Sequence, residues 1–245
     1  GLWSDPANWI CSASDGNLRL GYPSYGNRVR WYGNQTAVVY VDGEYTGLDQ
    51  CFWDNSGLYL TLVGTVDNAK TLFGNTSTTG NTHITLDHVE ASSGGFGVGD
   101  NGEFRLVNGA AYSTSWRCEI EGNNALLYVG SGCRLTVATS GDGYEYRLGL
   151  AGTDSRIIID GGTVSARCVK IGKSKTAVPY GIVFSGESPS LRVSKQFRVE
   201  QALDNGDGPL FLFKVPASGW DSAPIQRNNS SRIFLEQTAS GRSEE

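Results

Sequence analysis

The chain has 245 residues, with 33 glycines, no methionine and a formal net charge of −5. This length is enough for one large domain or two smaller ones around a hydrophobic core, and a charged fraction of only 18% excludes an intrinsically disordered chain. Nucleic acid is excluded as the main partner because Lys and Arg form no basic tract, and no apolar run reaches the roughly 18 residues that span a bilayer.

The first segment, residues 1–57, is predicted to be a terminal cap rich in aromatic residues. It holds four of the six tryptophans, which are Trp3, Trp9, Trp31 and Trp53. A stack of strands needs its terminal apolar cross-section covered, and an atypical end segment does this. The sequence starts at Gly1 with no signal-peptide pattern, as a mature secreted chain or an excised segment would.

Short β-rich runs follow one another through the remaining chain, each bounded by Gly, Asn, Asp or Ser. Apolar residues recur at every second position and not at the 3.6-residue period of a helix, so the chain is predicted to be all-β. The runs, including one within the cap segment, are residues 37–42, 58–63, 83–89, 104–107, 125–129, 134–137, 156–160, 163–166, 181–184, 197–200 and 209–215.

An internal repeat in the middle of the chain indicates the architecture. Four segments share an apolar–x–apolar order, then Gly or Ala, a polar turn and a second strand; their anchors are Val98, Val129, Leu150 and Ile171. The last two steps between anchors are 21 residues each, which fits one coil of a solenoid with three short strands. Residues 58–215 are therefore predicted to form a right-handed parallel β-helix, and residues 216–245 an exit strand and tail. A β-sandwich is the alternative, because regular short strands also fit it.

The opening Trp3-Ser-Asp-Pro-Ala-Asn-Trp9, followed by Pro23, resembles the start of large secreted bacterial β-helix proteins. The segments at 158–166 and 169–172 are similar to repeats of autotransporter-passenger-like and adhesin-like surface proteins. The resemblance implies a β-helix that is secreted or displayed on the cell surface. It transfers no catalytic residue, because those families share repeats and not a common site.

Catalytic patterns are weak in this sequence. Glu119 and Glu121 share one strand face, and the simplest interpretation of the pair is a solvated strand edge. His83 and His88 differ in parity along one strand, so their imidazoles are not expected to converge in a triad or a metal site. No catalytic residue is predicted, and an enzyme is the less favoured class.

Two groups of residues are candidates for glycan binding. The aromatic residues Trp31, Tyr32 and Trp53 offer ring faces for sugars, although packing inside the cap is the favoured interpretation of these rings. The basic residues Lys170 and Lys173 suit an acidic sugar chain, with Arg147 and Arg167 expected on nearby coils, and an ordinary solvent face is the alternative.

Calcium is the one cofactor that the sequence suggests. Asp100 and Glu103 lie in one turn-forming segment, and Asp204 and Asp207 lie in another. Oxygen ligands in turns suit a hard cation. Asn-Gly and Asp-Gly pairs are also common turn formers, so turn chemistry without a metal is the favoured interpretation.

The five cysteines contain no C-x-x-C pair, which excludes zinc-ribbon and thioredoxin-like motifs. Cys11 with Cys51, and Cys118 with Cys133, are candidate disulfides, and Cys168 is left over. The alternative is that all five are small buried hydrophobic residues.

These observations favour a non-catalytic, extracellular or cell-surface β-solenoid module that acts as an adhesin, stalk or assembly unit. The alternative is a carbohydrate-active β-helix, either a glycan-binding module or a lyase acting on acidic polysaccharide. The expected partners are polysaccharides or other cell-surface molecules. Self-association through the solenoid ends is a further expectation, because uncovered terminal strands pair edge to edge.

Overall fold

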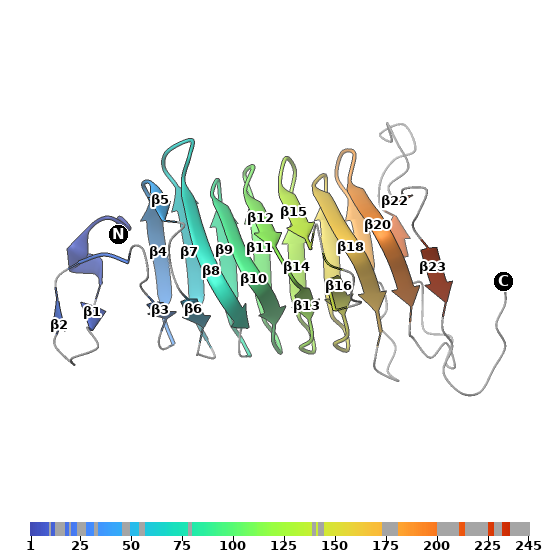
Figure 1. Ribbon diagram of the computed structural model, residues 1–245, viewed down its shortest axis with the longest axis horizontal. Coiled ribbons are helices and arrows are strands. Elements are labelled where there is room, and N and C mark those ends of the chain that lie inside the picture. Colours follow the sequence, from blue (N-terminus) through green and yellow to red (C-terminus); the bar gives the residue numbers. More distant parts are fainter. Residues whose placement is uncertain are drawn as a thin grey trace.

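The computed structural model is an elongated stack of β-strands, with the N-terminus at one end and the last described strand, residues 232–235, at the other (Figure 1). The structure describes residues 1–9, 11–12, 18–19, 21–23, 28–31, 34–45, 50–53, 57–77, 80–138, 141, 145–172, 181–199, 211–213, 225–227 and 232–235. Within these ranges the one helical element is the 3-10 turn η1 (Pro6–Asn8). No helix of the described residues has the length and apolar character to span a membrane.

Two long sheets run the length of the stack. The eight-stranded sheet contains β4 (Thr36–Val41), β7 (Tyr59–Gly64), β9 (His83–Asp87), β11 (Glu103–Val107), β14 (Leu126–Val129), β17 (Arg156–Asp160), β19 (Ile182–Ser185) and β21 (Phe211–Phe213). The eleven-stranded sheet contains β5 (Glu44–Tyr45), β8 (Lys70–Ser77), β10 (Glu90–Val98), β12 (Ala111–Thr114), β13 (Cys118–Ile120), β15 (Arg134–Val137), β16 (Arg147–Leu150), β18 (Thr163–Ile171), β20 (Ser190–Val199), β22 (Ile225–Arg227) and β23 (Arg232–Leu235).

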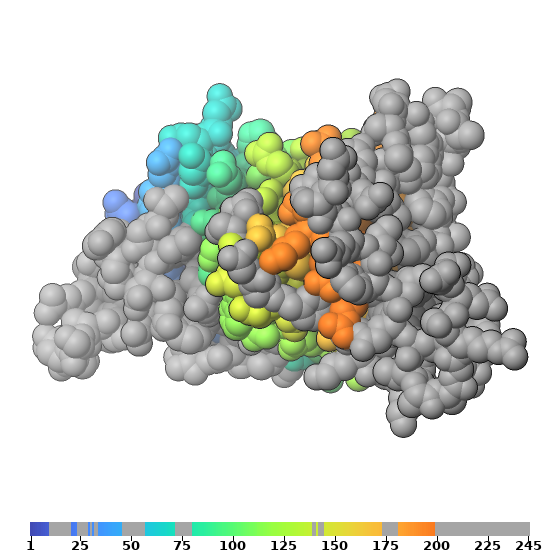
Figure 2. Space-filling view, turned by 45° about the vertical axis from the view of Figure 1, so that its right-hand side comes forward, coloured from blue at the N-terminus to red at the C-terminus, as the bar shows by residue number. Residues whose placement is uncertain are grey.

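Strands of successive coils pair in parallel in both sheets, which confirms the predicted β-solenoid and excludes the β-sandwich. In the space-filling view the coils follow one another in sequence order, from teal through green to orange (Figure 2). Two small pairs lie near the N-terminus: β1 (Cys11–Ser12) with β2 (Leu18–Arg19), antiparallel, and β3 (Arg28–Trp31) with β6 (Gln50–Trp53), parallel.

Each central coil has three strand positions, as the repeat predicts. The first half of β10 pairs with β12, and its second half pairs with β13. One long strand in the coil of β10 is thus replaced by two short strands, β12 and β13, in the next coil. Strand β18 covers the positions of β15 and β16 in the same way, with a register shift between Ala166 and Cys168 where it changes position. A bulge of this kind bends a strand, and it forms the corner between two faces of the coil.

Three of the four residues predicted to anchor the repeat do occupy equivalent positions in successive coils. Val98, Leu150 and Ile171 stack in one row of the eleven-stranded sheet, and Ile120 fills the place between the first two. Val129 instead lies in the eight-stranded sheet. The apolar–x–apolar pattern occurs at more than one position of each coil, so sequence spacing alone did not assign this segment to its sheet.

Asparagines and aspartates stack in the turns that enter the eight-stranded sheet. Asn81, Asn101, Asn124 and Asp154 all have positive φ, between 52° and 56°. The N–H of Asn101 donates to the carbonyl of Asn123 at 2.7 Å, and the N–H of Asn124 donates to Thr153 at 2.8 Å. Because Asn and Asp tolerate the left-handed conformation, successive coils turn at the same place.

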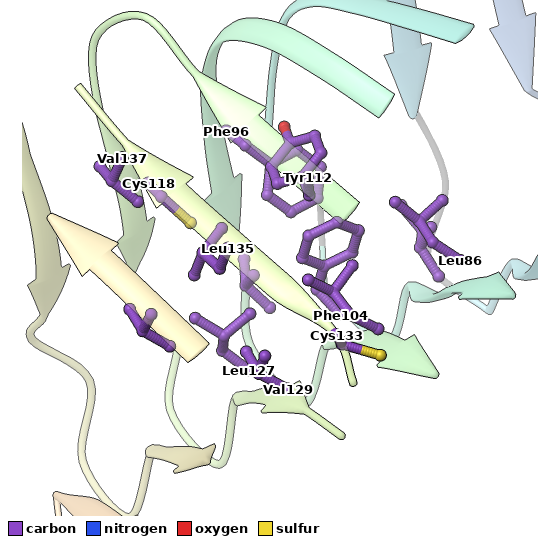
Figure 3. Packing of buried hydrophobic residues seen from close by; sticks show 14 of the residues in the cluster. Leu86, Phe96, Phe104, Tyr112, Cys118, Leu127, Val129, Cys133, Leu135 and Val137 are labelled. Atoms are coloured by element: carbon purple, nitrogen blue, oxygen red, sulfur yellow. The ribbon is translucent and has the colours of Figure 1, made fainter. Parts of the chain in front are cut away.

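The core is a column of inward-facing apolar side chains. One row of the eight-stranded sheet consists of Leu60, Ile84, Phe104, Leu127 and Ile157, all buried. Near its middle the rings of Phe96, Phe104 and Tyr112 pack together, with centroids 4.5 to 5.8 Å apart (Figure 3). The Tyr112 hydroxyl lies 2.6 Å from the Ser93 hydroxyl, which satisfies both buried polar groups.

Aromatic rings cover the N-terminal end of this column. Trp3 is fully buried and its ring centroid lies 5.0 Å from that of Trp9 and 5.3 Å from that of Tyr45. Trp31 extends the cluster through Trp9, at 5.5 Å. Strands β4 and β5 lie within the predicted cap segment, residues 1–57, yet they already belong to the two long sheets.

The predicted pairing of Cys118 with Cys133 is wrong. Both residues, and Cys168, are buried free thiols. Cys118 is stacked between Phe96 and Leu148 in the core, whereas Cys133 lies in the turn before β15, and Figure 3 shows the two sulfur atoms apart from each other. The side chains of Cys11 and Cys51 lie outside the described residues.

Candidate functional site

The candidate site is an outward face of the eleven-stranded sheet, at the strand position of β13, β16 and the ends of β18 and β20. Glu119, Gly149, Lys170 and Arg198 are neighbours in one row across these four strands. The residues on both sides of Glu119, Gly149 and Lys170 belong to the core, as does Phe197 before Arg198, so this row points outward.

Glu119 is only 5% exposed although it lies on the outer side of the sheet. Its neighbours in the row are Gly97 and Gly149, which have no side chains to displace it. A Cβ atom at Gly149 would lie 3.1 Å from Cγ of Glu119, closer than most such contacts. The two glycines therefore leave the hollow in which the Glu119 side chain lies.

Two arginines hold the carboxylate of Glu119. Nη1 of Arg117 lies 2.9 Å from Oε2, and Nη2 of Arg147 contacts Oε1. The guanidinium of Arg117 also lies over the ring of Trp116, with Cζ 4.2 Å from the ring centroid. Charge-assisted hydrogen bonds and a cation–π contact together fix the guanidinium groups in place.

Glu121 completes the cluster. A hydrogen bond with Glu119, together with burial and the negative charge of Glu119, raises the pKa of Glu121, although Arg117 and Arg147 oppose the shift. The interpretation of these two glutamates as a solvated strand edge is thus correct for the exposed Glu121 and wrong for the buried Glu119.

We call the outward surface formed by Arg117, Arg147, Lys170 and Arg198, with Glu119 among them, the basic face. Lys170 and Arg198 are direct neighbours on adjacent strands, which lie about 4.8 Å apart, so two cationic side chains start side by side on this surface. The sequence prediction that Lys170 and Arg147 lie on neighbouring coils is correct, and Lys173 lies outside the described residues.

The aromatic candidates for sugar binding do not form a platform in the described part of the chain. Trp31 is 7% exposed and packs in the aromatic cap, so its candidacy as a sugar-binding ring is wrong. The favoured interpretation, packing inside the cap, is the one observed, because the end of the core column needs cover. Tyr32 and the side chain of Trp53 lie outside the described residues.

The structure does not bring the calcium candidates Asp100 and Glu103 together. Oδ1 of Asp100 accepts a hydrogen bond from the N–H of Asn123 at 2.6 Å, within the stacked turns. Glu103 lies on the outer side of β11, with Arg105 at 2.7 Å and His83 at 3.6 Å. Partial burial acts to raise the pKa of Glu103, but the hydrogen bond and charge of Arg105, helped by His83, lower it below its usual value. These carboxylates serve turn and ladder contacts instead.

Across the residues that the structure describes, no three His, Cys, Asp or Glu side chains gather as a metal site would require. Asp204 and Asp207 lie outside those residues. His83 and His88 do not converge, as predicted: His83 stacks on Tyr59 and His88 lies in a turn with φ of 52°.

The role of Glu119 was missed in the sequence, although a signal was present. The triplets at 96–98, 118–120, 148–150 and 169–171 all have an apolar–x–apolar pattern, and x is Gly, Glu, Gly and Lys in turn. Glycine on both sides of an acidic residue leaves space for that residue to be covered. Comparison of the chain with protein-family models, curated proteins and solved structures finds no match.

Proposed function

We propose that this chain is an extracellular β-solenoid module of the adhesin type, which attaches to an acidic polysaccharide through the basic face. The observation that carries the proposal is the Arg117–Glu119–Arg147 cluster beside Lys170 and Arg198. The chain as a whole is acidic, with a net charge of −5, so a surface of this composition stands out.

The geometry suits a polymer with repeated negative charges. Guanidinium groups bind carboxylate and sulfate groups with directed hydrogen bonds, and Glu119 and Trp116 hold Arg117 in one orientation before a ligand arrives. Such preorganisation reduces the entropy lost on binding. Because the cationic residues come from successive coils, an extended chain can contact several of them at once.

Binding without turnover is the form of activity that we propose. Both oxygens of the Glu119 carboxylate are already engaged by arginines, so neither is directed at a bound sugar. The extracellular setting is supported by the resemblance of the Trp3–Trp9 opening to secreted bacterial β-helix proteins.

The test is binding to polygalacturonate, alginate and heparin, with neutral dextran as the comparison, measured by calorimetry over a range of salt concentrations. We expect binding to the acidic polymers alone, with affinity that falls as salt rises. Lys170→Gln should weaken binding about tenfold, corresponding to about 1.4 kcal/mol.

Arg156→Gln is the matched control, because Arg156 is an exposed cation on the other long sheet. Equal losses in Lys170→Gln and Arg156→Gln would show that net charge, and not the basic face, determines binding. Release of shortened or unsaturated products from any of the polymers would overturn the non-catalytic assignment.

A further inference from the structure

A second surface lies on the outer side of the eight-stranded sheet at its N-terminal end. The large hydrophobic residues that the structure shows as exposed are Leu2, Tyr22, Val38, Tyr40, Tyr59 and Val66, all from the first third of the chain. Four of them belong to this sheet or pair with it. We call the surface formed by Leu2, Val38, Tyr40 and Tyr59 the tyrosine face.

Strand register fixes the arrangement of the tyrosine face. Tyr59 of β7 lies beside Thr36 of β4, and Tyr40 of β4 lies between Leu2 and Val63. Tyr40 and Tyr59 are thus separated by one strand spacing and by four residues along the strand, which together amount to about 14 Å. That separation matches a short oligosaccharide better than a single sugar ring.

Tyr59 is held in place although it is 49% exposed. Its ring stacks on the imidazole of His83 with centroids 4.3 Å apart and planes 4° apart. His83 in turn lies 3.6 Å from Glu103, and Glu103 accepts a hydrogen bond from Arg105 at 2.7 Å. One ring face of Tyr59 is therefore occupied by His83, and the opposite face is directed toward the short side chain of Thr36.

We propose that the tyrosine face binds an uncharged oligosaccharide, whose rings lie against Tyr59 and Tyr40. The apolar C–H faces of a sugar ring suit an aromatic ring. Thr61 and Val38 form the pair between the levels of the two tyrosines, and Thr36 lies beside Tyr59, so two threonine hydroxyls are available to hydrogen-bond with the sugar. None of the residues that form this face carries a charge, so it differs in ligand class from the basic face. A rigid tyrosine also loses little entropy when it binds.

The experiment uses cello-, xylo- and manno-oligosaccharides of four to six sugars as probes, with binding followed by calorimetry and by NMR. We expect one of these series to bind, Tyr59→Ala and Tyr40→Ala each to weaken it about tenfold, and Tyr59→Phe to retain it. Tyr22→Ala is the matched control, because Tyr22 is 41% exposed but lies in the cap. Thermal unfolding of each variant checks that the fold is kept.

Two outcomes would overturn this inference: no binding of any of the three series, or binding that Tyr59→Ala leaves unchanged. Sedimentation analysis adds a third, since self-association that Tyr59→Ala abolishes would make a second copy of this chain the occupant. The test is separate from that of the basic face, because Lys170→Gln should leave binding of uncharged sugars as it is.

Discussion

Arg147 of β16 forms an ion pair with Glu119 of β13, across the boundary between two coils. The residue directly opposite Glu119 is Gly149, so the Glu119 side chain lies over a backbone with no side chain and meets Arg147 diagonally. The ion pair thus depends on a glycine that is two residues away from the arginine. This relationship leads to the first prediction.

Gly149→Ala should destabilise the protein by about 1 to 2 kcal/mol, as overpacking does in tight sites. The new Cβ would lie 3.1 Å from Cγ and 3.3 Å from Oε1 of Glu119, which would have to move away from Arg147. Urea unfolding measures the change. Gly21→Ala is the control, because nothing lies within 4 Å of a Cβ there. Equal stabilities of the two variants would show that Glu119 does not fill this space.

Glu119→Gln should cost about 2 to 3 kcal/mol in the free energy of unfolding. Removing one partner of a buried ion pair leaves the other without its counter-charge, and partial exposure of Arg117 places the cost toward the low end. The same variant should bind acidic polysaccharide more weakly, because the arginines lose their fixed orientation. Denaturant unfolding and calorimetry measure the two effects, and a variant as stable as the parent would contradict the proposed role.

The pH dependence of stability provides a test of Glu121. Its pKa is raised above 4.5 in the folded protein by the hydrogen bond with Glu119 and by burial. A raised carboxyl pKa means that the folded state binds the proton more tightly than the unfolded state. The free energy of unfolding should therefore fall as pH rises from about 4.5 through the folded pKa of Glu121.

Glu121→Gln should remove that part of the pH dependence, since glutamine keeps a hydrogen-bond donor but does not titrate. Urea unfolding from pH 4 to pH 8 compares the variant with the parent. Glu90→Gln serves as the control, because Glu90 is exposed on β10 and should leave the profile unchanged. Parallel profiles of the parent and Glu121→Gln would argue against a proton shared with Glu119.

The fold was predictable because its main causes are local in sequence. Alternation in segments such as Arg134–Val137 sets strand and face, and asparagines such as Asn101 and Asn124 turn the chain where φ is positive. Both features can be recognised without knowing how the strands of one coil align with those of the next.

The basic face could not be predicted in full, because it depends on lateral register between coils of unequal length. Aligned positions are 20 residues apart from His83 to Glu103 but 30 apart from Leu126 to Arg156. A fixed period of 21 therefore cannot place Arg147 beside Glu119. The same limit applies to Trp31, since its sequence shows that it is aromatic but not that the cap buries it.

Asp42 connects the N-terminal segment to the first coil, and this contact should make the cap sensitive to acid. Oδ1 of Asp42 accepts hydrogen bonds from the Tyr45 hydroxyl at 2.7 Å and from the Ser4 N–H at 3.2 Å, and Oδ2 accepts one from the Ser4 hydroxyl. Burial acts to raise the pKa of Asp42, but the hydrogen bonds from Ser4 and Tyr45 outweigh it and lower the pKa below 3.8.

A lowered carboxyl pKa stabilises the folded state at pH values above the unfolded pKa, and this contribution is lost as pH falls from about 3.8 through the folded pKa. Asp42→Asn should therefore destabilise the protein by about 1 kcal/mol at pH 7 and by less at pH 3. Asp67→Asn, in the turn after β7, is the control, and it should change the free energy of unfolding little at either pH. Asp42 accepts a hydrogen bond from Tyr45, whose ring stacks on Trp3, and four of the six tryptophans lie in residues 1–57. Tryptophan fluorescence therefore reports mainly on the cap, while circular dichroism reports on the coils. Loss of the fluorescence signal before the strand signal in Asp42→Asn would show that the cap opens separately, whereas unchanged stability at pH 7 would contradict a role for Asp42 in holding it.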